Sequence, residues 1–164
     1  MGSSGSGKSE SLNIIQNKDK IISDDIIAIE FSNDNAISLN GLPALCIKSN
    51  NSLRELKDKR QRSLEIIPEK LMVKNKLKVY DIFFLGWGEN NSIHEIDDSS
   101  AFKQMILNSF RPIPTGDCLK SEKFYLSSLT KLISTTEQYI FNRKKGNIIQ
   151  SVEKLYEFLN KKYD

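Results

Sequence analysis

Four residues near the start of the chain have the spacing of a phosphate-binding loop. Gly2, Gly7, Lys8 and Ser9 satisfy the pattern G-x-x-x-x-G-K-[ST], in which glycine amides and a helix N-terminus surround a nucleotide phosphate. The pattern works only between a buried strand and a helix, and Met1 alone precedes Gly2. Residues 1–9 also have the small-residue composition of an artificial leader peptide. We therefore expect a tag-like, flexible leader at residues 1–9 and no bound nucleotide.

Nucleophilic catalysis would need a thiol beside an imidazole, and the chain holds two cysteines and one histidine. Cys46 or Cys118 could pair with His94 in such a dyad. Neither cysteine lies at a recognisable helix start, where the helix dipole lowers a thiol pKa. Cys46 lies in an apolar run, which is typical of a small core residue. An enzyme would need a pocket that gathers His94 and distant carboxylates, so we expect no catalytic residue and a non-enzymatic protein.

Metal and redox chemistry lack a matching pattern as well. The cysteines lie 72 residues apart with no patterned neighbours, which favours a reducing, intracellular location in the cytoplasm or nucleus. Glu55 and Lys57 have the spacing of a metal-dependent nuclease but fall on a predicted surface helix. We expect no metal site and no cofactor.

A basic stretch spans residues 48–78, with ten basic and four acidic residues and hence a net charge of +6. Such a stretch could follow a phosphate backbone, which makes DNA or RNA an alternative partner. Lysines on a hairpin also keep edge strands from aggregating, and the stretch has no aromatic residue for base stacking. The basic residues are Lys48, Arg54, Lys57, Lys59, Arg60, Arg62, Lys70, Lys74, Lys76 and Lys78.

Trp87 is the only tryptophan, and Gly86 and Gly88 flank it. Its indole could project from the end of a strand and bind a partner, because tryptophan is enriched at binding hot spots. Alternatively, it folds back and closes the end of the sheet. Our candidate partner-binding residues are Trp87, Glu89, His94, Tyr156 and Tyr163.

The first half of the chain predicts strands. Apolar runs at 26–31, 36–39, 44–47 and 63–67 alternate with turn residues. Residues 79–85 are almost continuously apolar, which is typical of a central strand covered on both faces. A capping box that begins at Ser52 predicts one surface helix. We expect a mainly antiparallel sheet over about residues 26–86.

The second half predicts helices that cover this sheet in an α+β fold. Asp97 has the chemistry of an N-cap for a helix that ends before Pro112. An apolar stripe from Tyr125 to Ile140 predicts one long helix that starts at Ser121 and closes at Gly146. Asn147 would cap a final helix. Residues 121–164 should form an antiparallel helical hairpin within a single domain of residues 10–164.

Length and composition set the outer limits. With 164 residues, 38% of them hydrophobic, and a net charge of +3, the chain can bury a core without disulfides. No apolar run reaches the roughly 20 residues of a membrane span, so we expect no membrane association. The expected function is a protein-protein interaction module, a domain or subunit of a larger intracellular assembly, with nucleic-acid binding as the alternative.

Overall fold

The computed structural model describes residues 1–2, 5–15, 19–24, 27–39, 44–48, 62–66, 73, 75–109 and 118–164, with the backbone alone at 44–48, 62–66, 109 and 118–121. The helices are α1 (Lys8–Ile15), α2 (Asp98–Ser109), α3 (Cys118–Thr135) and α4 (Ile148–Tyr163). The strands are β1 (Ile29–Ser32), β2 (Asn35–Ser38), β3 (Ala44–Lys48), β4 (Arg62–Ile66), β5 (Leu77–Lys78), β6 (Asp81–Gly88), β7 (Ser92–Glu95) and β8 (Glu137–Lys144).

Within these residues the strands form three small sheets, ordered β1-β2-β5, β3-β4 and β6-β8-β7. Four of the five strand pairs are antiparallel, whereas β6 and β8 run parallel. The α+β class and the predominance of antiparallel pairs are therefore confirmed. The expectation of one sheet over residues 26–86 is wrong, because β6 pairs with a strand from the last third of the chain.

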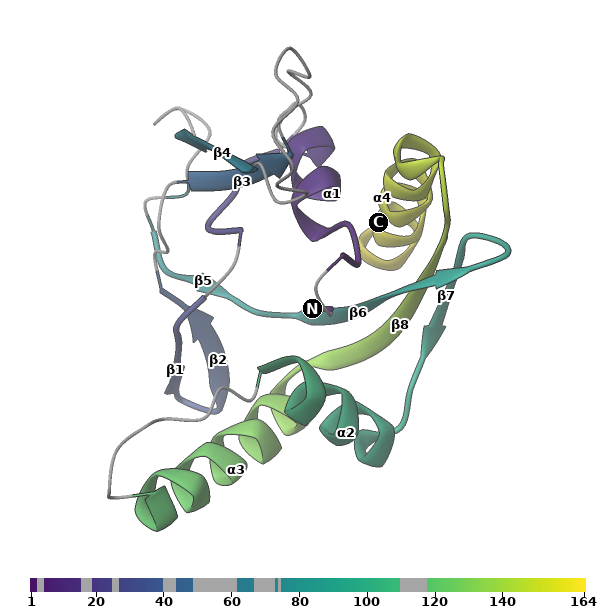
Figure 1. Cartoon of the computed structure of the whole chain (residues 1–164). Helices are drawn as coiled ribbons and strands as arrows, with labels where there is room; N and C mark the ends of the chain where they lie inside the picture. Colours follow the sequence, from purple (N-terminus) through teal and green to yellow (C-terminus); the bar gives the residue numbers. More distant parts are fainter. Residues whose placement is uncertain are drawn as a thin grey trace.

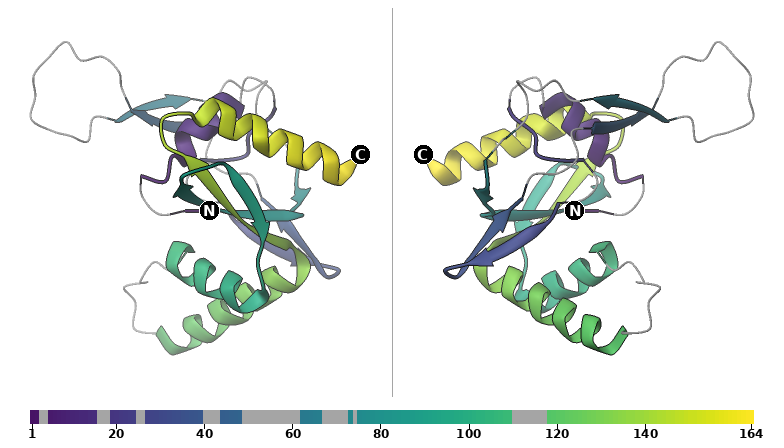
Figure 2. Two further views of the ribbon diagram at one scale, coloured as in Figure 1. Left: turned by 90° about the vertical axis from the view of Figure 1, so that its right-hand side faces the viewer. Right: turned by 90° about the vertical axis from the view of Figure 1, so that its left-hand side faces the viewer.

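The β6-β8-β7 sheet lies between two helical layers. Helices α1 and α4 lie on one side of it, and α2 and α3 lie on the other (Figures 1 and 2). On the α4 side, Phe83 and Tyr139 stack with ring centroids 5.2 Å apart, and Phe158 of α4 meets both rings edge-on. The prediction that β6 is covered on both faces is confirmed, since its alternate side chains point into the opposite core. The prediction that it is the central strand is wrong, because β8 lies between β6 and β7.

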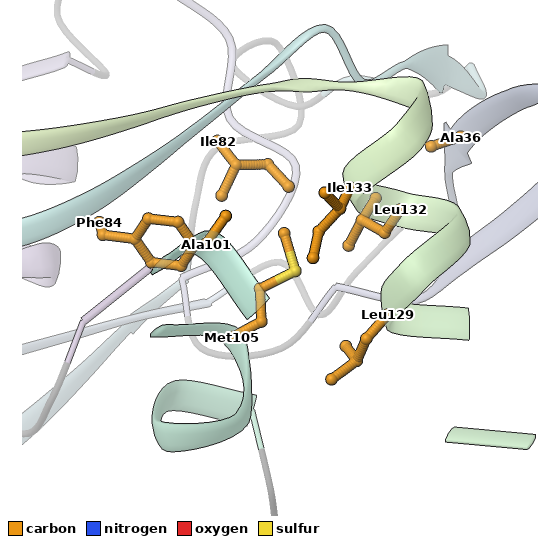
Figure 3. Packing of buried hydrophobic residues seen from close by; sticks show 8 residues of the cluster. All are labelled: Ala36, Ile82, Phe84, Ala101, Met105, Leu129, Leu132 and Ile133. Carbon is orange, nitrogen blue, oxygen red and sulfur yellow. The ribbon is translucent and has the colours of Figure 1, made fainter. Parts of the chain in front are cut away.

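That opposite core joins β6 to α2 and α3 (Figure 3). Ile82 and Phe84 from β6 meet Met105 from α2, which has no exposed surface. Burial of such side chains contributes roughly 1.5–3 kcal/mol each. The buried members of the cluster are Ala36, Ile82, Phe84, Ala101, Met105, Leu129, Leu132 and Ile133.

The predicted caps of α2 and α4 are confirmed. The Asp97 carboxylate accepts from the Ser100 amide at 3.0 Å, and its pKa is lowered by the hydrogen bonds from the Ser100 hydroxyl and amide. The Asn147 side chain accepts from the Gln150 amide at 3.2 Å. Each cap satisfies an amide that the helix itself leaves without a partner.

The predicted helical hairpin over residues 121–164 is wrong. Helix α3 ends at Thr135, and residues 137–144 form β8 instead. The Thr136 hydroxyl donates to the Leu132 carbonyl, and Nε2 of the Gln138 side chain donates to the Ile133 carbonyl at 2.9 Å. These bonds satisfy carbonyls of the last helical turn, so the chain can leave the helix and pair with β6. Residue 140 lies on the helical stripe by coincidence of spacing.

Candidate functional site

Met1 occupies a strand position beside β6. Its amino group donates to the Phe83 carbonyl at 2.5 Å, and its carbonyl accepts from the Leu85 amide at 2.7 Å. A residue that bonds in this way to two positions flanking Phe84 has the pattern of a parallel strand. This pairing is limited to Met1, since the first strand of the described residues is β1. Met1 nevertheless brings the start of residues 2–9 to the edge of β6.

The N-terminal loop, described at residues 2 and 5–9, leads from this position into α1, which starts at Lys8. Gly5 and Gly7 have φ angles of +81° and +75°, a region that side chains disfavour. A Cβ atom at Gly7 would also lie 3.3 Å from the Trp87 ring and 3.4 Å from Arg143 Nη1. The backbone conformation thus favours glycine at position 7, and an added Cβ would in addition press on Trp87 and Arg143.

Side chains at the start of α1 tie the loop together. Lys8 Nζ donates to the Gly2 carbonyl at 2.7 Å, across the loop. Ser9 donates to Asp24 at 3.0 Å, and Ser11 donates to the Gly7 carbonyl at 2.9 Å. Helix α1 begins at Lys8, so its positive dipole end lies next to the loop.

Two residues at the ends of β6 and β8 support the loop from below. Trp87 donates from Nε1 to the Gly5 carbonyl at 3.3 Å. Arg143 donates from Nη1 to Ser11 Oγ at 2.8 Å and lies 3.4 Å from the Gly7 carbonyl. Arg143 has no exposed surface, and its Nε and Nη2 have no hydrogen-bond partner among the described residues. The Ser6 hydroxyl, also buried, has none there either.

Positive charge accumulates around the loop. Burial, followed by the charges of Lys8 and Arg143, lowers the pKa of the Met1 amino group to about 5. Burial also lowers the pKa of Arg143, and the charge of Glu10 opposes that shift. Bringing an anion into the loop would relieve these unfavourable charges.

The five candidate partner-binding residues are divided among β6, the loop after it, β7 and α4. Trp87 is half-buried against the N-terminal loop, Glu89 is exposed after β6, and His94 is exposed on β7. Tyr156 and Tyr163 both lie on α4, where their hydroxyls donate to Asp19 and Asp81, respectively. Burial raises the pKa of each tyrosine, and the bond to its carboxylate adds to the shift.

Four of the ten basic residues lie in the described part of the chain. The side chains of Lys76 and Lys78 are exposed, and Lys76 forms an ion pair with Glu30 at 2.5 Å. Lys48 and Arg62 are described as backbone in β3 and β4. The others, Arg54, Lys57, Lys59, Arg60, Lys70 and Lys74, lie outside the described residues.

The cysteine predictions need one correction. Cys118 is the first residue of α3, so the expectation that neither cysteine begins a helix is wrong for this one. The side chains of both cysteines lie outside the described part of the chain. Among the described residues, no group of three or more His, Cys, Asp or Glu side chains is arranged to hold a metal ion. None of the described helices has the length and apolar character of a membrane span.

Sequence reasoning missed Met1, Ser11 and Arg143 as parts of this site. The glycine-lysine-serine pattern was the available signal. The residue that supports it, Met1, bonds to Phe83, which lies 82 positions away in the sequence. Arg143 carries no local signal, since only the β6–β8 pairing brings it beneath the loop.

No protein-family profile, characterised protein or solved structure matches this chain significantly.

Proposed function

We propose that this protein binds the phosphate groups of a nucleotide in its N-terminal loop. The observation that carries the proposal is the setting of the loop between Met1, paired with β6, and α1, which starts at Lys8. Met1, hydrogen-bonded alongside β6, and α1 take the places of the strand and the helix that flank a phosphate-binding loop.

Several groups support anion binding at this position. Left-handed glycines expose their amides on the concave side of a turn, and helix-start amides add partial positive charge. Lys8 Nζ bonds to a loop carbonyl, which a phosphate oxygen could replace with a stronger, charge-assisted bond. The proposal is limited to binding and includes no hydrolytic step. A reducing, intracellular location stays our expectation and agrees with a nucleotide ligand.

Calorimetric titration with ATP and with pyrophosphate tests the proposal. The unmodified protein should bind both, and Lys8→Met should bind each at least tenfold more weakly. The matched control is Lys123→Met, because Lys123 is an exposed residue of α3 on the far side of the sheet. Binding in the control should match the unmodified protein. Absence of binding to the unmodified protein, or equal affinities in Lys8→Met, would refute a phosphate-binding loop.

A protein partner is a second candidate function, supported by exposed apolar side chains on two helices that pack together. Leu107 of α2 is 78% exposed and Phe124 of α3 is 74% exposed. Side chains this apolar favour burial against a partner. If they form a binding surface, Leu107→Ser with Phe124→Ser should abolish partner capture without changing phosphate affinity. The described residues add no support to the nucleic-acid alternative.

A further inference from the structure

We propose that Arg143 is a positioning residue for the N-terminal loop and that its uncompensated charge makes the loop prefer highly charged phosphate ligands. This inference rests on the proposed phosphate-binding function and names the feature that would select pyrophosphate groups over a single phosphate. Arg143 acts from beneath the loop, through Gly7 and Ser11, and we assign it no direct contact with the ligand.

The position of Arg143 is fixed from several sides. Its guanidinium centre lies 4.7 Å from the Trp87 ring centroid and 5.9 Å from that of Phe141. Nη1 bonds to Ser11 Oγ at 2.8 Å and faces the Gly7 carbonyl. Guanidinium groups stack on aromatic faces in a way that an ammonium does not reproduce. The contacts hold the charge directly under the turn that Gly7 makes.

The charge of Arg143 lacks a paired carboxylate. Among the described residues Arg143 takes part in no ion pair, and Glu10 is the acid whose charge acts on it. Lys8 adds further positive charge nearby. A buried cation without a counter-charge strongly favours an anion placed close to it. The attraction grows with ligand charge, so it should favour pyrophosphate over inorganic phosphate.

If Arg143 served only to stabilise the fold, its replacement would lower the unfolding temperature of the ligand-free protein. The Gly7 carbonyl also accepts from Ser11 Oγ at 2.9 Å, so it keeps a partner when Arg143 is replaced. Apolar residues that replace a poorly paired buried charge often leave stability unchanged or increase it. The variant Arg143→Met should therefore be at least as heat-stable as the unmodified protein without ligand, yet bind anions worse.

Calorimetric titration of pyrophosphate and inorganic phosphate into Arg143→Met tests this inference. We expect affinity for pyrophosphate to fall at least tenfold and the preference over inorganic phosphate to shrink, with an unchanged or higher unfolding temperature of the ligand-free protein. The control is Lys144→Met, because Lys144 is the exposed next residue of β8. This control should stay within twofold of the unmodified protein.

Because Trp87 is the only tryptophan and contacts the loop, its fluorescence gives a second readout of binding. Arg143→Lys keeps the charge, so it should retain the preference for pyrophosphate while overall affinity falls. If Arg143→Met does not fold, loss of that preference in Arg143→Lys overturns the inference. Unchanged pyrophosphate affinity in folded Arg143→Met also overturns it. If the unmodified protein binds neither anion, the proposed function itself fails.

Discussion

Arg143 and Trp87 are partners in the parallel register of β8 and β6, and the guanidinium lies over the indole ring. Trp87 in turn donates to the Gly5 carbonyl, so the parallel strands β6 and β8 reach the N-terminal loop through one stacked pair. The indole folds against the loop instead of projecting freely from the sheet. A tryptophan flanked by two glycines suggests either arrangement, and only the neighbouring strand distinguishes them.

Gly7→Ala should weaken both the fold and pyrophosphate binding. A left-handed alanine costs about 1 kcal/mol or more, and its methyl group would press on Trp87 and Arg143. The matched control is Gly146→Ala, because Gly146 has a φ of +84° with open space around it. Thermal unfolding should show a loss of stability in both variants. Calorimetry should show lost affinity in Gly7→Ala alone, and equal affinities would mean that the loop tolerates a side chain there.

Lys162→Met should destabilise the fold by about 1–3 kcal/mol, since Asp81 would lose its charged partner in a mostly buried position. Lys162 Nζ bonds to Asp81 at 2.5 Å and to Glu137 at 2.9 Å, and the Asp81 side chain is only 8% exposed. The exposed Lys154–Glu157 pair of the same helix offers a control. Lys154→Met should change the free energy of unfolding by less than about 0.5 kcal/mol in urea titrations. Equal losses of unfolding free energy in the two variants would show that the Lys162–Asp81 pair stabilises the fold no more than the exposed pair does.

The contribution of Lys162 to the free energy of unfolding should decrease at strongly alkaline pH. Burial disfavours the charge of Lys162, but the hydrogen bonds that its ammonium donates to Asp81, Tyr139 and Glu137 outweigh burial and raise the pKa above its ordinary value of 10.5. A raised pKa in the folded state stabilises the protein below the ordinary value, and this stabilisation is lost as pH rises through the folded-state pKa. The stability difference between the unmodified protein and Lys162→Met should therefore stay constant up to about pH 10 and narrow as the pH rises above 10.5. A constant difference above that value would contradict it.

Met105→Ala should cost about 2–5 kcal/mol, because it leaves a cavity where α2, α3 and β6 meet. Met105 has no exposed surface, whereas Leu107, two residues later on α2, is 78% exposed. Leu107→Ala should change the free energy of unfolding by about 0.5 kcal/mol or less. Denaturant unfolding of the two variants compares burial at nearly constant helix position. Similar losses would mean that Leu107 is covered by a contact of the kind we propose for a partner.

Local signals predicted the parts of the fold that local contacts form. The β1–β2 hairpin turns at Asn33 and Asp34, both with positive φ angles, which asparagine and aspartate tolerate. Asp97 and Asn147 each cap a helix within three residues of themselves. In each case the interaction that forms the turn or cap joins residues close together in the sequence, so the local residue pattern predicts it.

The errors arose where distant pairing decides the structure. Residues 137–144 continue an apolar spacing that suits a helix, yet β6 offers a partner strand 56 positions earlier in register. Short apolar segments fit either structure, and tertiary pairing then selects one. The setting of residues 2–9 is hidden from local patterns for a similar reason, because Met1 before them bonds to Phe83 and Leu85, far along the chain.

The span of the loop contacts has a consequence for folding kinetics. The Arg143–Ser11 hydrogen bond joins residues 132 positions apart, and the Met1–Phe83 bond joins residues 82 positions apart. Bringing such distant segments together is entropically costly, so these contacts should form after the local ones in α2 and α4. A ligand that binds only the completed loop then stabilises contacts absent from the transition state. Such a ligand should slow the unfolding reaction and leave the refolding rate almost unaltered.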